Sequence, residues 1–187
     1  PGLLVRYEWP ETTTAAEHPY SLHKDSRILL AWSAAGGAVP AAAHVEAIAT
    51  ACRTAALPFD RAADVLCDAT LDGISGALAA AERAGRPISI LHLLCHGAET
   101  DGAFCLCLNA DASSEGPGIV DAGRLRQILS PYAGTLRLVV LMACDSGNLG
   151  PLGSQLGSVA QALHRAGLAA VVASRYPLSV GGSSRFC

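Results

Sequence analysis

The stretch Ile88-Ser-Ile-Leu-His-Leu-Leu-Cys95 is followed at once by His96-Gly97. Such a nearly continuous apolar run is typical of a strand that helices cover on both faces of a parallel sheet. A second run of the same character, Leu136-Arg-Leu-Val-Val-Leu-Met-Ala143, is followed at once by Cys144. In open parallel sheets, ligands bind outside the carboxyl ends of the strands. The two runs therefore predict a parallel sheet with His96 and Cys144 at its ligand-binding edge.

The rest of the chain alternates between strand-like and helix-like patterns. Further strands are expected over residues 27–33, 59–67, 103–109 and 169–174. Helices are expected between Pro40 and Pro58, from the cap Thr70 to Gly85, after the cap Asp121, and over residues 158–166. Loops are expected over residues 110–118 and 147–157. This alternation predicts the α/β class, with a mostly parallel sheet covered by helices on both faces.

Length and composition limit the organisation and the partners. A chain of 187 residues with 51% hydrophobic residues is expected to bury one core, so we predict one domain over residues 26–187, preceded by a lead-in or edge strand over residues 1–25. Because the chain stops at Cys187, we expect that domain to be incomplete at its C-terminus. The net charge of −3 favours a peptide or protein partner over nucleic acid.

Targeting signals and cysteine usage predict a cytoplasmic protein. The sequence holds no apolar run of 18 residues, so no membrane partner is expected, and its first residues lack the pattern of a signal peptide. The seven cysteines form no spaced framework, and several lie in apolar runs where a free thiol packs as a small hydrophobe. A reducing compartment suits such thiols.

A cysteine and a histidine at one sheet edge can carry out acyl transfer. A free thiol is only a few per cent thiolate at neutral pH, so Cys144 needs a neighbouring base, and His96 is the candidate. Gly97 has no Cβ, which lets a substrate carbonyl approach its backbone amide. We expect the amides of Gly97 and Cys144 to form an oxyanion hole. This chemistry requires no cofactor and no metal.

Two segments resemble the catalytic motifs of a known family. Leu91-His-Leu-Leu-Cys-His-Gly97 and Leu138-Val-Val-Leu-Met-Ala-Cys-Asp-Ser-Gly147 are similar to the histidine and cysteine motifs of the CHAT family, relatives of caspases, metacaspases and separases. The separation of 48 residues between His96 and Cys144 is close to the histidine-to-cysteine spacing of caspases. Further similar segments are Leu30-Ala-Trp-Ser33, Val39-Pro40 with His44, and Val171-Val-Ala-Ser-Arg-Tyr-Pro177.

The resemblance implies a caspase-like three-layer fold and a cysteine endopeptidase with a Cys-His dyad. It also implies cleavage of a protein substrate, in antiviral defence or cell-death signalling of bacteria. Members of the family are activated by a sensor domain or subunit, in some bacterial members a cyclic-nucleotide-binding SAVED domain on the same chain. A non-catalytic caspase-like adaptor or scaffold is the alternative that uses the same fold.

Residues near the dyad offer candidate substrate contacts. Asp145 either selects a basic side chain next to the cleaved bond or is a surface or capping aspartate, and the sequence favours neither. Ser174, Arg175 and Tyr176 are expected to pair with an extended substrate as an added strand, as the family does.

Other histidines and cysteines have plainer interpretations. His92 lies inside the buried run, and we predict a hydrogen-bonded core histidine there. Cys95, Cys105 and Cys107 suggest a redox or metal-sensing module as a further alternative. Their spacing matches no closed zinc pattern, so packing in the core is the favoured interpretation.

Overall fold

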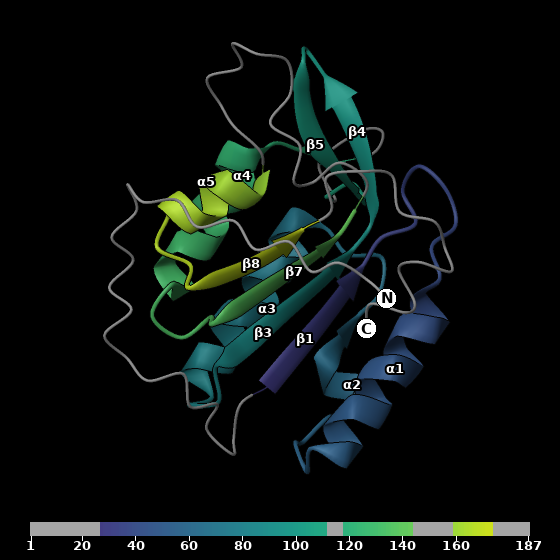
Figure 1. Ribbon diagram of the computed structural model, residues 1–187, viewed down its shortest axis with the longest axis vertical. Helices are drawn as coiled ribbons and strands as arrows, with labels where there is room; N and C mark the ends of the chain where they lie inside the picture. The colour runs from purple at the N-terminus through teal and green to yellow at the C-terminus, as the bar shows by residue number, and fades with distance from the viewer. Residues whose placement is uncertain (1–26, 112–117, 144–158, 174–187) are drawn as a thin grey trace, which may run out of the picture.

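The computed structural model describes residues 27–111, 118–143 and 159–173. In this part of the chain, strands and helices largely alternate around a central sheet (Figure 1). The strands are β1 (Arg27–Trp32), β2 (Val65–Leu66), β3 (Ile88–Leu94), β4 (His96–Thr100), β5 (Ala103–Leu108), β6 (Gly118–Val120), β7 (Leu138–Met142) and β8 (Ala170–Ala173). The helices are α1 (Ala41–Thr54), α2 (Arg61–Asp64), α3 (Leu71–Arg83), α4 (Ala122–Leu129), the 3-10 turn η1 (Ser130–Tyr132) and α5 (Val159–Arg165).

The central sheet has five parallel strands in the order β2-β1-β3-β7-β8. The two apolar runs that predicted the fold form β3 and β7, which lie side by side with Leu94 opposite Met142. Because β3 has a neighbour on each side and helices above and below, five of its seven residues are buried.

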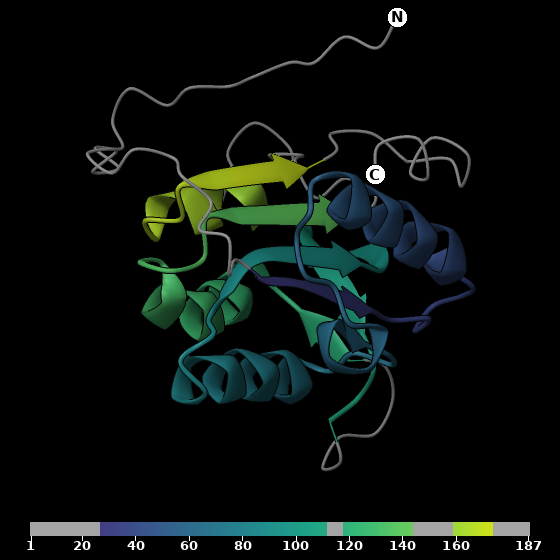
Figure 2. The ribbon, with the colours of Figure 1, turned by 90° about the horizontal axis from the view of Figure 1, so that it is seen from below.

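Side chains alternate between the two faces of this sheet. Leu29, Leu91 and Val139 occupy one row of the register and belong to the main core, which α3, α4 and α5 cover. Leu30 points to the opposite face and packs with Ile48 and Cys52 of α1. Figure 2 shows α1 on the other side of the sheet from α3 and α4. The predicted α/β fold, with a mostly parallel sheet and helices on both faces, is confirmed.

A second, antiparallel sheet of three strands follows the end of β3, in the order β4-β5-β6. Its hairpin β4–β5 extends beyond the carboxyl ends of the central strands (Figure 1). His96, predicted to lie directly after the first buried strand, does so, and it is also the first residue of β4, where it pairs with Cys107 of β5. Part of the loop expected over 110–118 lies outside the described residues, but Gly118 begins β6.

The predicted helix caps are confirmed. Thr70 Oγ1 accepts a hydrogen bond from the amide of Gly73 at 2.9 Å. Asp121 Oδ1 accepts one from the amide of Arg124, also at 2.9 Å. Side chains that satisfy free amides in this way fix the start of a helix locally.

None of the helices within the described ranges is long and apolar enough to cross a bilayer.

The predicted strand over 59–67 is mostly wrong. Its centre is the one-turn helix α2, and β2 alone pairs with β1. Asp60 caps α2 by accepting the amide of Ala62 at 3.0 Å, and Asp64 Oδ2 accepts the amide of Asp60 at 2.8 Å. These two aspartates satisfy backbone donors that a strand would have paired with a neighbour.

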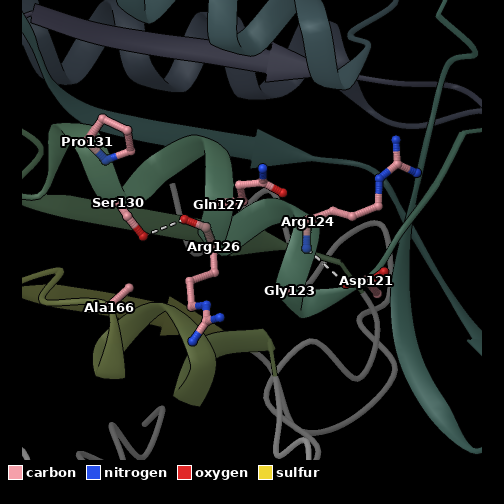
Figure 3. A pocket seen from close by; sticks show the side chains of 8 residues that line it. All are labelled: Asp121, Gly123, Arg124, Arg126, Gln127, Ser130, Pro131 and Ala166. Atoms are coloured by element: carbon pink, nitrogen blue, oxygen red, sulfur yellow. Dashed lines mark hydrogen bonds between the residues drawn. The ribbon is translucent and has the colours of Figure 1, made fainter.

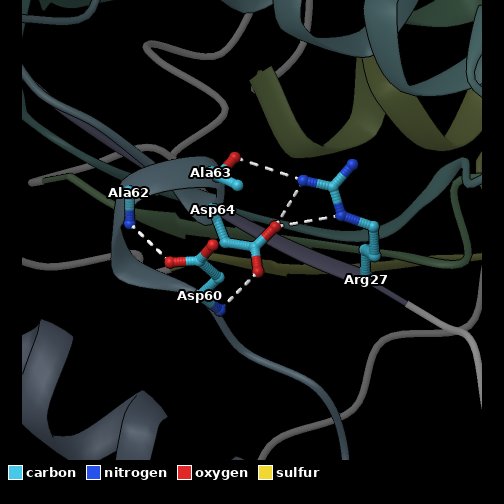
Figure 4. A network of polar contacts seen from close by, with 5 residues as sticks. All are labelled: Arg27, Asp60, Ala62, Ala63 and Asp64. Carbon is cyan, nitrogen blue, oxygen red and sulfur yellow. Dashed lines mark hydrogen bonds and ion pairs between the residues drawn. The ribbon is translucent and has the colours of Figure 1, made fainter.

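A buried ion pair joins this helix to the start of β1 (Figure 4). Arg27 Nη2 lies 2.5 Å from Asp64 Oδ1, and Arg27 Nε donates to the same oxygen at 3.0 Å. Arg27 Nη2 also donates to the carbonyl oxygen of Ala63 at 3.2 Å. The side chains of Arg27 and Asp64 are only 14% and 4% exposed. The amino end of β1 is therefore joined to α2 by an ion pair that is largely shielded from water.

Candidate active site at the carboxyl edge of the sheet

The candidate site begins where three central strands end. The amide of Ser33, just after β1, donates to the carbonyl of Leu94 at 2.9 Å. The amide of Cys95, just after β3, donates to the carbonyl of Met142 at 3.2 Å. These bonds continue the ladders by one residue and bring the ends of β1, β3 and β7 to one edge. His96 leaves the sheet at this edge, as predicted from the sequence.

The His96 ring lies against the turn that follows β1. This turn, residues 34–37, is closed by a hydrogen bond from the amide of Gly37 to the carbonyl of Ala34 at 3.0 Å. A Cβ atom added at Gly36 would lie 3.6 Å from His96 Cβ, and one added at Gly37 would lie 3.3 Å from His96 Nε2. Gly36 and Gly37 have φ angles of +88° and +142°, which side chains disfavour. The imidazole is thus packed against bare backbone.

His96 is half-buried, and its Nε2 atom is fully buried with no hydrogen-bond partner among the described residues. A buried polar atom without a partner is uncommon, since it costs about 1 to 3 kcal/mol, and a catalytic role is one explanation for it.

A serine and an asparagine support the same turn. Ser33 is fully buried, and its Oγ donates to Asn109 Oδ1 at 2.5 Å while accepting the amide of Ala35 at 3.1 Å. Asn109 directly follows β5, and its own amide donates to the carbonyl of Ala69 at 2.9 Å. The turn is therefore linked to the ends of both sheets.

The structure describes only some of the predicted site residues. Gly97 is the second residue of β4, half-buried and opposite Leu106. Ala143, which is buried, is the last described residue before the predicted nucleophile. The other predicted residues, Cys144, Asp145, Ser174, Arg175 and Tyr176, lie outside the described residues.

His92 is the predicted core histidine, and that prediction is confirmed. It is 5% exposed, and its Nε2 lies 3.0 Å from Nδ1 of His44 on α1, which is fully buried. The two rings meet edge to face, with centroids 5.2 Å apart. Burial, followed by the nearby His44, lowers the pKa of His92 to about 4, and burial lowers that of His44 too. Both rings are thus neutral near pH 7.

The three cysteines of the alternative metal or redox module are buried. Burial raises the pKa of the Cys107 thiol, and burial, followed by Asp121, raises that of Cys105. Such thiols stay protonated and react poorly as nucleophiles. Within the described ranges, no group of three His, Cys, Asp or Glu side chains is arranged to hold a metal ion. The favoured interpretation, packing of these thiols in the core, agrees with their burial.

A surface pocket of about 640 Å³ lies on α4 and the end of α5 (Figure 3). None of the predicted site residues lines it. Arg124 on its wall donates to the carbonyl of Ile119 at 3.2 Å, and Ser130 Oγ donates to the carbonyl of Arg126 at 2.6 Å. These bonds fix the two ends of α4, so the polar groups serve the helix itself.

Four residues near His96 were not predicted as part of the site, namely Ser33, Gly36, Gly37 and Asn109. The sequence held a signal for the first three, because a serine ends an apolar strand and two glycines follow it. Asn109 had no such signal, since it lies 76 residues from Ser33 and only the fold brings them together.

A comparison with protein families assigns the chain to one of them. The sequence model of the CHAT domain matches residues 15–187, which is most of the chain. This protein therefore belongs to the CHAT domain family, a caspase-like family related to proteases. No curated protein matches the chain significantly.

Proposed function

We propose that this chain is a cysteine endopeptidase in which Cys144 is the nucleophile and His96 the general base. The observation that carries the proposal is the hydrogen bond between Cys95 and Met142, because it ends β3 and β7 at one edge. In the sequence, His96 directly follows Cys95 after β3, and Cys144 directly follows Ala143 after β7. Successive Cα atoms are 3.8 Å apart, and this short distance supports a dyad at this edge.

The proposed reaction has two stages. His96 accepts the thiol proton of Cys144, the sulfur attacks the peptide carbonyl carbon, and the backbone amides of Gly97 and Cys144 stabilise the oxyanion. His96 then donates the proton to the leaving amine as the C–N bond breaks, which leaves a thioester. Water, deprotonated by His96, attacks the thioester, the C–S bond breaks, and the proton returns to the thiolate. The peptide acid is released.

Substrate and setting are part of the same proposal. An extended protein segment would bind along Ser174, Arg175 and Tyr176, with Asp145 facing the residue before the cleaved bond. The family resemblance supports a cytoplasmic role in bacterial defence or cell death, with a sensor domain or subunit as activator. The described residues offer no cluster for a metal, and the proposed chemistry draws on side chains and backbone amides alone.

The test is cleavage of a positional-scanning peptide library by the complete parent protein, with and without candidate activators such as cyclic nucleotides. Cys144→Ala and His96→Ala are each expected to lower kcat/KM by at least about 10³-fold, since they remove nucleophile and base. The matched controls are Cys67→Ala, an exposed thiol, and His164→Gln on α5, which should retain activity.

Activity that survives Cys144→Ala would overturn the mechanism. If no peptide is cleaved under any condition, the rate of Cys144 alkylation decides the matter. A thiolate generated by His96 reacts with iodoacetamide faster at pH 7 than an ordinary thiol, and His96→Ala abolishes that excess. Equal alkylation rates with and without His96 would favour the adaptor alternative.

A further inference from the structure

The turn at residues 34–37 contacts the edge of the His96 ring that carries Nε2. The atoms nearest to a Cβ built at Gly37 are Nε2, Cε1 and Cδ2 of His96, at 3.3, 3.8 and 4.0 Å. Contacts of 3.3 Å are tighter than ordinary van der Waals distances, so any side chain at Gly37 would push the ring or the turn aside. The backbone of this turn is therefore a wall that fixes where the imidazole lies.

The wall is itself held in place by polar contacts. Ser33 Oγ donates a hydrogen bond to Asn109 Oδ1 and accepts one from the amide of Ala35, which lies inside the turn. Asn109 is anchored to Ala69, whose amide in turn donates to the carbonyl of Trp32 at 2.8 Å. This chain of contacts joins the ends of β1 and β5, so the turn cannot shift without breaking hydrogen bonds that are partly buried.

We propose that Ser33, Gly36, Gly37 and Asn109 are positioning residues for His96, which they hold by its Nε2 edge so that Nδ1 exchanges the proton during catalysis. The inference rests on the proposed function, because it assigns the ring nitrogen that acts in that mechanism. Nε2 faces the wall and has no partner among the described residues, which leaves Nδ1 to act as the base. In that role Nδ1 must be unprotonated in the neutral ring, so the ring proton is on Nε2. The lone pair of Nδ1 then accepts the proton of the thiol.

The first experiment compares Gly37→Ala with Gly85→Ala in the complete parent protein. Gly85 also has a positive φ, of +68°, and no atom lies within 4 Å of a Cβ built there, so its variant places an alanine at positive φ without any ring contact. Gly37→Ala is expected to lower kcat by about 100-fold with little change in KM, since a small displacement of a catalytic group costs that much. Gly85→Ala should keep kcat within about twofold of wild type.

A second readout does not depend on activity. In protein labelled with ¹⁵N-histidine, the ring nitrogens of wild-type His96 should show the tautomer protonated at Nε2, and Gly37→Ala should shift this balance or broaden the signals. A wild-type ring protonated at Nδ1 would overturn the assignment of the acting nitrogen. Unchanged kcat and unchanged ring signals in Gly37→Ala would overturn the positioning role.

The third comparison tests the support of the turn. Asn109→Ala and Ser33→Ala are each expected to lower kcat by up to about tenfold, as for the loss of one hydrogen bond. Asn109→Asp keeps the acceptor for Ser33 Oγ and should restore kcat to within about twofold. If Asn109→Asp is as slow as Asn109→Ala, the proposed support is wrong.

These outcomes separate the two proposals. If His96→Ala abolishes cleavage while Gly37→Ala and Asn109→Ala do not, the peptidase stands and the positioning role fails. If His96→Ala leaves cleavage intact, the proposed function fails, and the ring spectra of the Gly37 variant still decide whether the turn positions the ring.

Discussion

The two ends of β1 differ in whether their buried polar groups have hydrogen-bond partners. At the amino end, Arg27 and Asp64 form a buried ion pair, and Asp64 accepts hydrogen bonds on both oxygens (Figure 4). At the carboxyl end, Ser33 is satisfied, but Nε2 of the neighbouring His96 is buried without a partner in the described part of the chain. The first arrangement pairs both charged groups, whereas the second leaves one ring nitrogen without a partner among the described residues.

We infer that this difference separates stability, at the amino end of β1, from the proposed function, at its carboxyl end. Polar groups that are buried and fully paired are most costly to disrupt one at a time, because the partner is left as an unpaired charge. A half-buried ring with a nitrogen that lacks a partner among the described residues adds little stability, and this ring is the proposed catalytic base. We therefore expect changes at the amino end to alter unfolding, and changes at the carboxyl end to alter activity.

The largest effect on stability is expected from Asp64→Ala. It leaves the Arg27 charge buried without its partner and should lower the free energy of unfolding by about 3 to 5 kcal/mol. Urea unfolding at pH 7 measures this. The double variant Arg27→Leu with Asp64→Leu is the control and should recover most of the loss, since apolar residues can replace such a pair. A loss below about 1 kcal/mol in Asp64→Ala would contradict the expectation that the amino end of β1 contributes mainly to stability.

Low pH is expected to lower the free energy of unfolding through the histidine pair of His44 and His92, which lies between the two ends of β1. Because the pKa of His92 is lowered to about 4 in the fold and is about 6.5 when unfolded, the unfolded state binds its proton first as the pH falls. Stability is therefore complete above about pH 6.5 and declines toward pH 4, by about 2 to 3 kcal/mol. Burial of His44 adds a loss of the same sign.

Urea unfolding between pH 7 and pH 4.5 measures this decline, with His92→Gln as the matched variant. Glutamine can keep a hydrogen bond to His44 Nδ1 but does not titrate, so the slope of stability against pH should become shallower. An unchanged slope in His92→Gln would show that the acid sensitivity arises elsewhere.

The smallest effect is expected at an exposed ion pair on the same side of the fold. Arg61 Nη2 and Glu46 Oε1 are 2.6 Å apart, but their side chains are 58% and 63% exposed. Water and salt screen such a pair, so Arg61→Ala should change the free energy of unfolding by about 0.5 kcal/mol or less. Urea unfolding of this variant beside Asp64→Ala sharpens the comparison, and a loss as large as that of Asp64→Ala would contradict burial as the cause.

Local sequence signals predicted the central strands and the helix caps correctly. The apolar runs at β3 and β7 required burial on both faces, and Thr70 and Asp121 satisfied backbone amides a few residues away. The segment 59–67 was predicted wrongly because side chains of Asp60 and Asp64 replace strand pairing there. Strand β4 was missed because its polar, glycine-containing sequence pairs only through β5.

The sequence by itself determined the α/β class, the family, and the place of His96 at the end of a buried strand. These follow from periodicity and motif, which depend on residues near one another in the chain. The tertiary structure alone decided that Ser33 meets Asn109, that His44 meets His92, and that a glycine turn lies on the His96 ring. Each of these contacts joins residues at least 48 positions apart, so only the packing of the strands and helices brings them together.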